Sequence, residues 1–112
     1  LDREEKIRVA KTDWQANRTV VAKDRNRNML VFVTEGGFFT LYNFGRFLRE
    51  SAFHVHTAMN MDGGYEACMA VRTPQLNYTT YGQYETYGPS KNVSIRGAKI
   101  NIPTVTGVIQ RR

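Results

Sequence analysis

Two short β-rich runs joined by a polar turn restrict the fold of this chain more than any other feature. Residues 18–23 are rich in threonine and valine, and residues 29–34 form a second run that is mostly apolar. Residues 24–28 between them are Asp, Arg, Asn, Arg and Asn, which favour a turn. The two runs therefore predict a β-hairpin. Because the second run is apolar on both faces, we expect it to be a buried central strand.

One amphipathic helix is predicted after the hairpin. The glycine pair in residues 35–37 ends the second run, and Thr40 is a typical helix N-cap. Apolar residues then follow at helical spacing, at Leu41, Phe44, Phe47 and Leu48. This pattern predicts the main helix at about residues 40–51.

The rest of the chain predicts further strands and one long loop. Residues 57–61 and 65–71 have the composition of a third and a fourth strand. Residues 73–98 are polar and rich in turn formers, so we expect a loop there. Residues 100–109 indicate a closing strand. The expected fold class is α+β, with a mixed or antiparallel sheet and the helix packed on it.

Length and charge limit the kind of protein. We expect the 112 residues to form one domain at 14–112, preceded by a charged arm or lead-in at 1–13. No run reaches the roughly 18 apolar residues that a membrane span needs. The net charge of +6 favours anionic partners such as nucleic acid, acidic membranes or acidic glycans. The one cysteine, Cys68, excludes a disulfide within the chain.

Residues 58–67, Ala-Met-Asn-Met-Asp-Gly-Gly-Tyr-Glu-Ala, are the best candidate for a site. They place Asn60, Asp62, Gly63 and Gly64 between two apolar runs. The two polar side chains are candidate reactive groups, and the glycines would let a ligand come close to the backbone. Asp-Gly is also a strong turn former, so a plain hairpin turn is the alternative.

Metal binding is a second alternative for these residues. Asn60, Asp62 and Glu35 carry the oxygen atoms that Ca²⁺ or Mg²⁺ prefers, although we expect no cofactor. His54 and His56 have a spacing that can chelate a metal, but no cysteine or acidic residue lies near them in sequence. We therefore expect a structural or solvated histidine pair.

A row of tyrosines occupies the predicted loop. Tyr78, Tyr81, Tyr84 and Tyr87 recur at every third residue. Such rings can stack on sugars or bases, pack within the loop, or contact another chain. Tyr81 and Tyr84 are therefore candidate substrate-binding residues.

Four segments follow one another in an order that is typical of a known family. They are Arg-Thr-Val-Val-Ala at 18–22, Glu-Gly-Gly at 35–37 before the Thr40 helix start, Asn-Met-Asp-Gly-Gly at 60–64, and Ile-Pro-Thr-Val-Thr-Gly-Val at 102–108. This series resembles the phosphodiester glycosidase family. The family includes the uncovering enzyme of the lysosomal pathway, which removes N-acetylglucosamine from a phosphodiester on mannose, and many exported bacterial relatives.

The resemblance implies a hydrolase that cleaves a sugar-1-phosphodiester. A phosphate monoester is a good leaving group, so the site needs a cation near the phosphate more than a general acid. Arg18 matches the arginine that precedes the first strand in the family, and it is the candidate for the phosphate. Asp62 is the candidate catalytic carboxylate and Glu35 the candidate second one. Asn60, Gly63 and Gly64 would contact the sugar.

The resemblance also implies surroundings for the chain. It implies a carbohydrate or glycan phosphodiester substrate and a secreted, periplasmic or cell-envelope location. The family domain usually has a further N-terminal half, so we expect that half as a separate or missing segment. A non-catalytic binding module for an acidic glycan or cell-envelope polymer is the alternative function. Nucleic acid is not an expected partner, because no nucleic-acid-binding motif is present.

Overall fold

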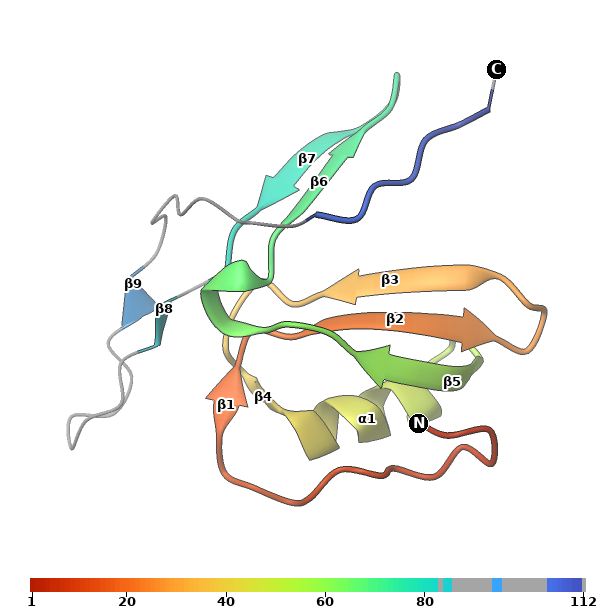
Figure 1. Ribbon diagram of the computed structural model, residues 1–112, viewed down its shortest axis with the longest axis vertical. Helices are drawn as coiled ribbons and strands as arrows, with labels where there is room; N and C mark the ends of the chain where they lie inside the picture. The colour runs from red at the N-terminus through yellow and green to blue at the C-terminus, as the bar shows by residue number, and fades with distance from the viewer. Residues whose placement is uncertain (83, 86–93, 96–104, 112) are drawn as a thin grey trace.

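The computed structural model describes residues 1–82, 84–85, 94–95 and 105–111. Within that part, antiparallel sheets and one α-helix form an α+β fold, as the sequence predicted (Figure 1). The elements are β1 (Gln15–Ala16), β2 (Thr19–Asp24), β3 (Met29–Val33), β4 (Phe39–Thr40), α1 (Leu41–Glu50), β5 (Val55–Asn60), the 3₁₀ turn η1 (Gly64–Glu66), β6 (Met69–Arg72), β7 (Asn77–Thr80), β8 (Tyr84–Glu85) and β9 (Ser94–Ile95).

The main sheet has the strand order β3-β2-β5, and both pairings are antiparallel. The predicted hairpin is confirmed, with Thr19 paired to Val33 at its open end. Asp24 closes the turn, because its carboxylate accepts hydrogen bonds from the backbone and the side chain of Asn28, both at 2.8 Å. The polar residues between the two runs thus stabilise the turn directly.

The second run is not the central strand that its apolar sequence predicted. Among the described strands, β2 lies between β3 and β5, and β3 is at the edge. Leu30 and Phe32 pack against the core, whereas Met29 and Val31 are 66% and 51% exposed. Alternate side chains of a strand point to opposite faces, so only one face of β3 meets the helix layer.

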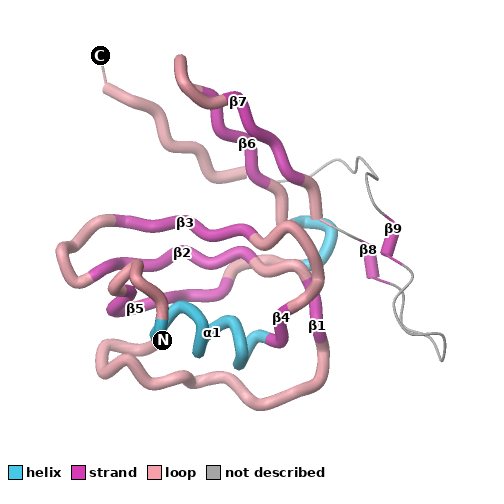
Figure 2. The backbone as a smooth tube through the Cα atoms, turned by 180° about the vertical axis from the view of Figure 1, so that it is seen from behind, coloured by secondary structure: helices cyan, strands magenta, loops and turns pink. Residues whose placement is uncertain are grey.

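Helix α1 packs on one face of the main sheet (Figure 2). Thr40 caps it as predicted, since its hydroxyl oxygen accepts a hydrogen bond from the amide of Asn43 at 3.1 Å. Phe44 and Leu48 are buried against core residues of β2 and β5, which are Val20, Ala22 and Val55. Each of these large side chains contributes about 2 kcal/mol by leaving water. This packing fixes the start of α1 beside β1 and β4, at one end of the sheet (Figure 1).

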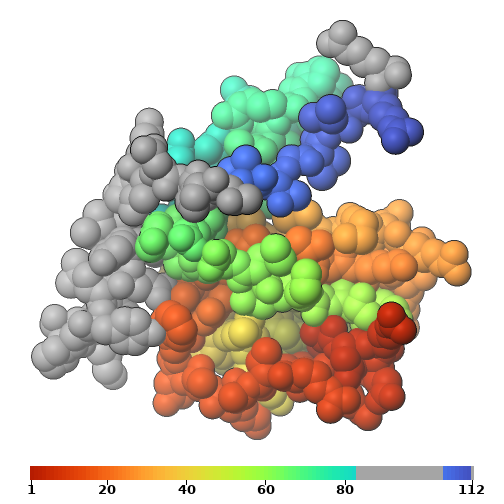
Figure 3. Space-filling model, in the orientation of Figure 1, coloured from red at the N-terminus to blue at the C-terminus, as the bar shows by residue number. Residues whose placement is uncertain are grey.

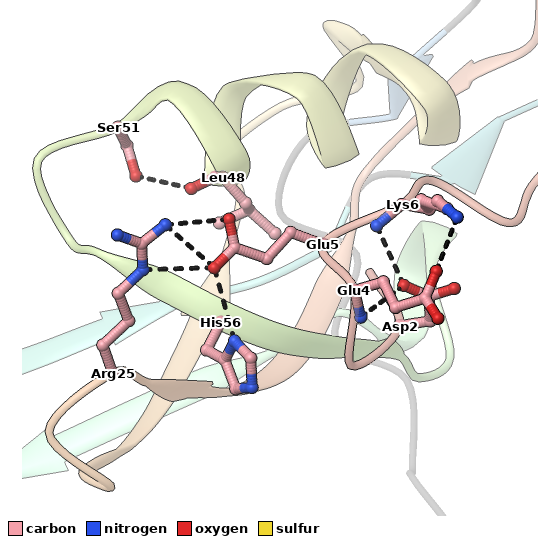
Figure 4. Close-up of polar contacts among 8 residues, drawn as sticks. All are labelled: Asp2, Glu4, Glu5, Lys6, Arg25, Leu48, Ser51 and His56. Atoms are coloured by element: carbon pink, nitrogen blue, oxygen red, sulfur yellow. Dashed lines mark hydrogen bonds and ion pairs between the residues drawn. The ribbon is translucent and has the colours of Figure 1, made fainter.

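Residues 1–13, the expected charged arm or lead-in, make specific contacts with the rest of the fold. The amino group of Leu1 donates to the carbonyl of Ala58 at 3.0 Å, and the amide of Ala58 donates back at 3.1 Å. Glu5 accepts hydrogen bonds from Arg25 at 2.9 Å and lies 3.3 Å from Nδ1 of His56 (Figure 4). His56 therefore has the structural role expected of it. Ionic and backbone contacts thus attach residues 1–5 to β5 and to the turn after β2.

The stretch expected as a loop at 73–98 contains strand structure. β7 pairs with β6 in an antiparallel hairpin, and β8 pairs with β9. The sequence Asn-Tyr-Thr-Thr of β7 suits a strand, but turn formers on both sides obscured it. The predicted fourth strand starts only at Met69, because residues 64–66 form η1 instead.

The closing strand predicted at 100–109 is not formed in residues 105–109, the part of this range that the structure describes. Residues 105–109 belong to no strand, and Val105 and Val108 are 79% and 91% exposed; residues 100–104 lie outside the described part. Figure 3 shows hairpin β6–β7 and residues 105–111 standing away from the main sheet. No helix in the described ranges is long and apolar enough to cross a bilayer.

Candidate functional site

The turn after β5 is attached to the segment that leads into β2. The amide of Met61 donates to the carbonyl of Thr19 at 2.8 Å, and the amide of Gly64 donates to the carbonyl of Asn17 at 3.1 Å. The strands on either side of the turn do not pair with each other, since β5 pairs with β2 and β6 with β7. The alternative of a plain hairpin turn is therefore wrong.

Residues 61–64 lie beside residues 17–19 across this junction. Val20 pairs with Asn60, and the Met61–Thr19 hydrogen bond continues the same register by one residue. The register then changes, because the next hydrogen bond joins Gly64 to Asn17. The backbone segments that contain Asp62 and Arg18 therefore lie side by side.

Arg18 is buried, with 7% of its surface exposed. Its Nε donates to the carbonyl of Phe39 at 3.2 Å, and its Nη2 donates to the carbonyl of Trp14 at 2.9 Å. The guanidinium also lies over the Trp14 ring, 5.5 Å from its centroid. These contacts satisfy a charge that would otherwise be costly to bury. They hold the cation between β1 and β4, whereas Asp62 is exposed.

Asn17 is the residue that joins the loops of the site, and sequence reasoning missed it. It has no exposed surface, and its Nδ2 donates to the carbonyl of Thr34 at 2.6 Å. Thr34 in turn accepts a hydrogen bond from the amide of Arg18 at 2.9 Å. With the Gly64 bond, Asn17 connects the turn of Asp62 to the loop that begins at Thr34. Nothing in the sequence marks this role beyond the position next to Arg18.

The two glycines of the turn are required by the chain itself. A Cβ on Gly63 would lie 2.6 Å from the carbonyl oxygen of Asn17, which is closer than real Cβ contacts. Gly64 has φ +63°, in the left-handed region that glycine adopts without strain. A Cβ on Gly82 would lie 2.1 Å from the Gly64 oxygen, so the segment before β8 packs directly on the turn. The group that lies close to Gly63 is therefore the backbone carbonyl of Asn17.

Glu66 forms a carboxyl pair with Asp62. Residues 64–66 form the tight η1 turn, in which the amide of Ala67 donates to the carbonyl of Gly64 at 3.2 Å. A side-chain hydrogen bond with Asp62, followed by the charge of the Asp62 carboxylate, raises the pKa of Glu66 above its ordinary value. The contact with Asp62 therefore favours the protonated form of Glu66. The sequence signal was available, since Glu66 follows the glycines by two residues, but its partner depends on the turn.

Glu35 lies on the loop after β3, and its carboxylate accepts a hydrogen bond from the hydroxyl of Tyr78. This bond raises the pKa of Tyr78, because the phenol proton is held by the carboxylate. Hairpin β6–β7 therefore contacts the Glu35 loop through a tyrosine of the predicted row. The carboxyl group that is hydrogen-bonded to Asp62 is therefore that of Glu66, whereas the Glu35 carboxylate contacts Tyr78.

Asn60, Tyr81 and Tyr84 are the remaining predicted site residues. Asn60 ends β5, and its Nδ2 donates to the carbonyl of Met61 at 2.7 Å. Tyr81 is 44% exposed, and it precedes the glycine that packs on the turn. The backbone of Tyr84 lies in β8, but the side chains of Tyr84 and Tyr87 are outside the described part.

The described residues contain no group of three or more histidine, cysteine or acidic side chains arranged to hold a metal ion. In particular, His56 contacts Glu5, and Glu35 contacts Tyr78. Asp62 is instead accompanied by Glu66, whose pKa is raised by this contact.

Comparison with known proteins adds one finding to this geometry. The family model for phosphodiester glycosidase matches residues 2–109. The match includes the N-terminal segment, which precedes the four segments that carry the resemblance. Neither the curated proteins nor the solved structures gave a match. Because the family model covers nearly the whole chain, this protein belongs to the phosphodiester glycosidase family.

Proposed function

We propose that the chain hydrolyses a sugar-1-phosphodiester, with Asp62 as its catalytic carboxylate. The observation that carries this proposal is the junction of Asp62, its carboxyl partner Glu66 and the buried cation Arg18 at one end of the sheet. The family membership supplies the reaction class. N-acetylglucosamine is the proposed sugar, and an extracytoplasmic compartment is the proposed location, both by analogy with the family.

The reaction breaks the bond between the anomeric carbon and the phosphate oxygen. The bonding electrons leave with the phosphate, and the oxygen of water adds to the anomeric carbon. Asp62, as nucleophile or base, would supply the negative charge that the cationic sugar needs. A buried guanidinium close by favours the departing anion, because the protein interior screens its charge less than water does. Arg18 is therefore proposed to stabilise the phosphate.

Glu66 is proposed to store the proton that this cycle moves. Its raised pKa keeps it protonated to a higher pH than an ordinary glutamate, while it is hydrogen-bonded to Asp62. A protonated Glu66 beside Asp62 leaves the pair with one negative charge instead of two. The second carboxylate proposed from sequence, Glu35, would act at the edge of the site with Tyr78.

The proposed sugar contacts come from the same end of the fold. Asn60 and the glycine pair Gly63–Gly64 lie on the turn itself, and Tyr81 lies beside it. Tyr84 is proposed as a further contact from its sequence position.

The test is hydrolysis of an N-acetylglucosamine-1-phosphodiester by the wild-type chain and by Asp62→Asn. We expect a loss of at least about 100-fold in kcat for Asp62→Asn, from the size of carboxylate effects in catalysis. Glu50→Gln is the control, because Glu50 is an exposed carboxylate at the far end of α1. Full activity in Asp62→Asn would refute the assignment. Binding of an acidic glycan polymer without turnover, unchanged in Asp62→Asn, would instead favour the binding module.

A further inference from the structure

Hairpin β6–β7 is joined to the loop after β3 by the contact between Tyr78 and Glu35. The hydroxyl of Tyr78 donates to Oε1 of the Glu35 carboxylate, and the two residues are 43 positions apart in the chain. The hairpin and the main sheet are separate sheets, and the hairpin stands away from the main sheet in Figure 3. This side-chain contact therefore links two parts of the fold whose strands do not pair with each other.

The backbone of Tyr78 is held within the hairpin. Tyr78 pairs with Val71 across the two strands. Nη1 of Arg72 donates to the carbonyl of Tyr78, and Nη2 donates to the hydroxyl of Thr79, both at 2.7 Å. Because these contacts restrain the strand at two successive residues, the phenol extends from a fixed point of the backbone.

The base of the hairpin is attached to the turn that carries Glu66. The Sγ of Cys68 donates to the carbonyl of Tyr65 at 3.3 Å, and the amide of Gly82 donates to the same sulfur at 3.5 Å. These two contacts join the segments before β6 and after β7 to η1. Both ends of the hairpin therefore meet at the candidate site.

The backbone of Glu35 is held from the other side of the site. The carbonyl of Thr34, in the peptide bond that precedes Glu35, accepts a hydrogen bond from Nδ2 of Asn17 at 2.6 Å. The carbonyl of the same Asn17 accepts a hydrogen bond from the amide of Gly64 at 3.1 Å. The loop of Glu35 and the turn of Asp62 therefore meet at one residue.

The side chain of Glu35 is exposed, and a glutamate without a partner has many rotamers in water. Tyr78 supplies that partner. The hydrogen bond to Glu35, and then partial burial, raise the pKa of Tyr78 above its ordinary value of 10.0, whereas a hydrogen bond with the side chain of Thr80 lowers it. The phenol therefore keeps its proton at neutral pH and donates it to the carboxylate.

We propose that Tyr78 is a positioning residue, which holds Glu35 in place as the second carboxylate of the site. In this role Glu35 takes the proton of the attacking water. The water oxygen bonds to the anomeric carbon as the phosphate leaves with the bonding electrons. Tyr78 contacts Oε1, and the second oxygen of the carboxylate accepts the proton. This inference rests on the proposed function, and it adds the residue that orients Glu35.

The kinetics of Tyr78→Phe with an N-acetylglucosamine-1-phosphodiester test this role, because only the hydroxyl is lost. We expect about tenfold lower kcat and a KM within about threefold of the wild-type value, since a misplaced base affects the transition state more than substrate binding. Tyr42→Phe is the matched control, because it removes a hydroxyl from α1 and keeps the ring that Lys11 contacts. Wild-type kcat in Tyr78→Phe, or equal losses in the two variants, would overturn the role.

A double-mutant cycle separates positioning from a general structural effect. Because Tyr78 acts through Glu35, the double variant Glu35→Gln with Tyr78→Phe should lose no more kcat than Glu35→Gln alone. Losses that multiply would refute the proposal. Wild-type kcat in Glu35→Gln would refute it as well, even if Tyr78→Phe failed to fold.

The contact itself can be measured without turnover. Carbon-13 NMR titration of the Tyr78 ring should give a pKa nearer to 10.0 in Glu35→Gln than in the wild-type chain, because the accepting carboxylate and its charge are lost. An unchanged titration would refute the contact and, with it, the positioning role.

These outcomes also distinguish the inference from the proposed reaction. A wild-type chain that does not hydrolyse the phosphodiester would refute the reaction together with the role of Tyr78 in it. A chain whose turnover depends on Asp62 but is the same with Tyr78→Phe would refute the positioning role alone.

Discussion

The amide of Gly64 donates a hydrogen bond to the carbonyl of Asn17 at 3.1 Å, and this contact ties the turn of Asp62 to the segment of Arg18. It joins residues that are 47 positions apart in the chain. A backbone contact therefore positions the two segments of the candidate site. These segments carry the charged side chains of Asp62 and Arg18. Changes at this contact should affect the site more than changes at the surrounding surface.

Gly63→Ala should shift the turn and destabilise the protein. The added Cβ would lie 2.6 Å from the Asn17 oxygen, and backbone on both sides limits the adjustment. We expect a loss of about 2 kcal/mol in the free energy of unfolding, as for other overpacked sites. Urea denaturation measures it. Gly107→Ala is the control, because a Cβ there meets no atom within 4 Å, and equal effects of the two changes would contradict the geometry.

Asn17→Ala should cost about 1–3 kcal/mol, because the partly buried carbonyl of Thr34 loses its donor. The effect should be non-additive with Gly63→Ala, since both changes act on one contact network. A double-mutant cycle from denaturation curves measures the coupling. Asn77→Ala removes an exposed asparagine and serves as the control. Strict additivity of Asn17→Ala and Gly63→Ala would show that the two residues are independent.

Asp62→Asn should lower the pKa of Glu66 towards its ordinary value of 4.5, because both the accepting carboxylate and its charge are lost. Carbon-13 NMR titration of the Glu66 carboxyl measures this without any substrate. The raised pKa of Glu66 also determines the direction in which stability changes with pH. The contribution of Glu66 is complete below pH 4.5 and is lost as the pH rises through its folded pKa. An unchanged Glu66 titration in Asp62→Asn would exclude the pair.

Acid should release the N-terminal segment from β5. Arg25, and then His56, lower the pKa of Glu5 below its ordinary 4.5, and Asp2 titrates at about 2. The stabilisation from both groups is present above their ordinary values, and it is lost as the pH falls through the lowered ones. Exchange of the Ala58 amide, which donates to the carbonyl of Leu1, reports the release.

Glu5→Gln should weaken this acid dependence, because it removes the charge that Arg25 and His56 contact (Figure 4). Glu4→Gln is the matched control, since the Glu4–Lys6 ion pair joins two residues within the segment. If both variants show the wild-type dependence of Ala58 exchange on pH, the Glu5 contacts do not hold the segment in place.

Much of the local structure was predictable from the sequence. The hairpin of β2 and β3 follows from two β-rich runs around a polar turn, and the Thr40 cap with its apolar spacing predicts α1. Strand β7 was missed because turn formers flank a run of four residues. Whether β3 is central or at an edge depends on which strand pairs beside β2, and a strand's own residues do not specify this.

The sequence by itself determined the family and the α+β class, and it singled out the turn at Asp62 as the candidate site, because these depend on residue types and their order along the chain. Only the tertiary structure decided the partners of that turn. Asn17, Glu66 and Trp14 enter the site through a backbone junction, a tight turn and a cation–π contact. Such contacts depend on strand register and on packing between distant segments, and local sequence patterns do not encode these distances.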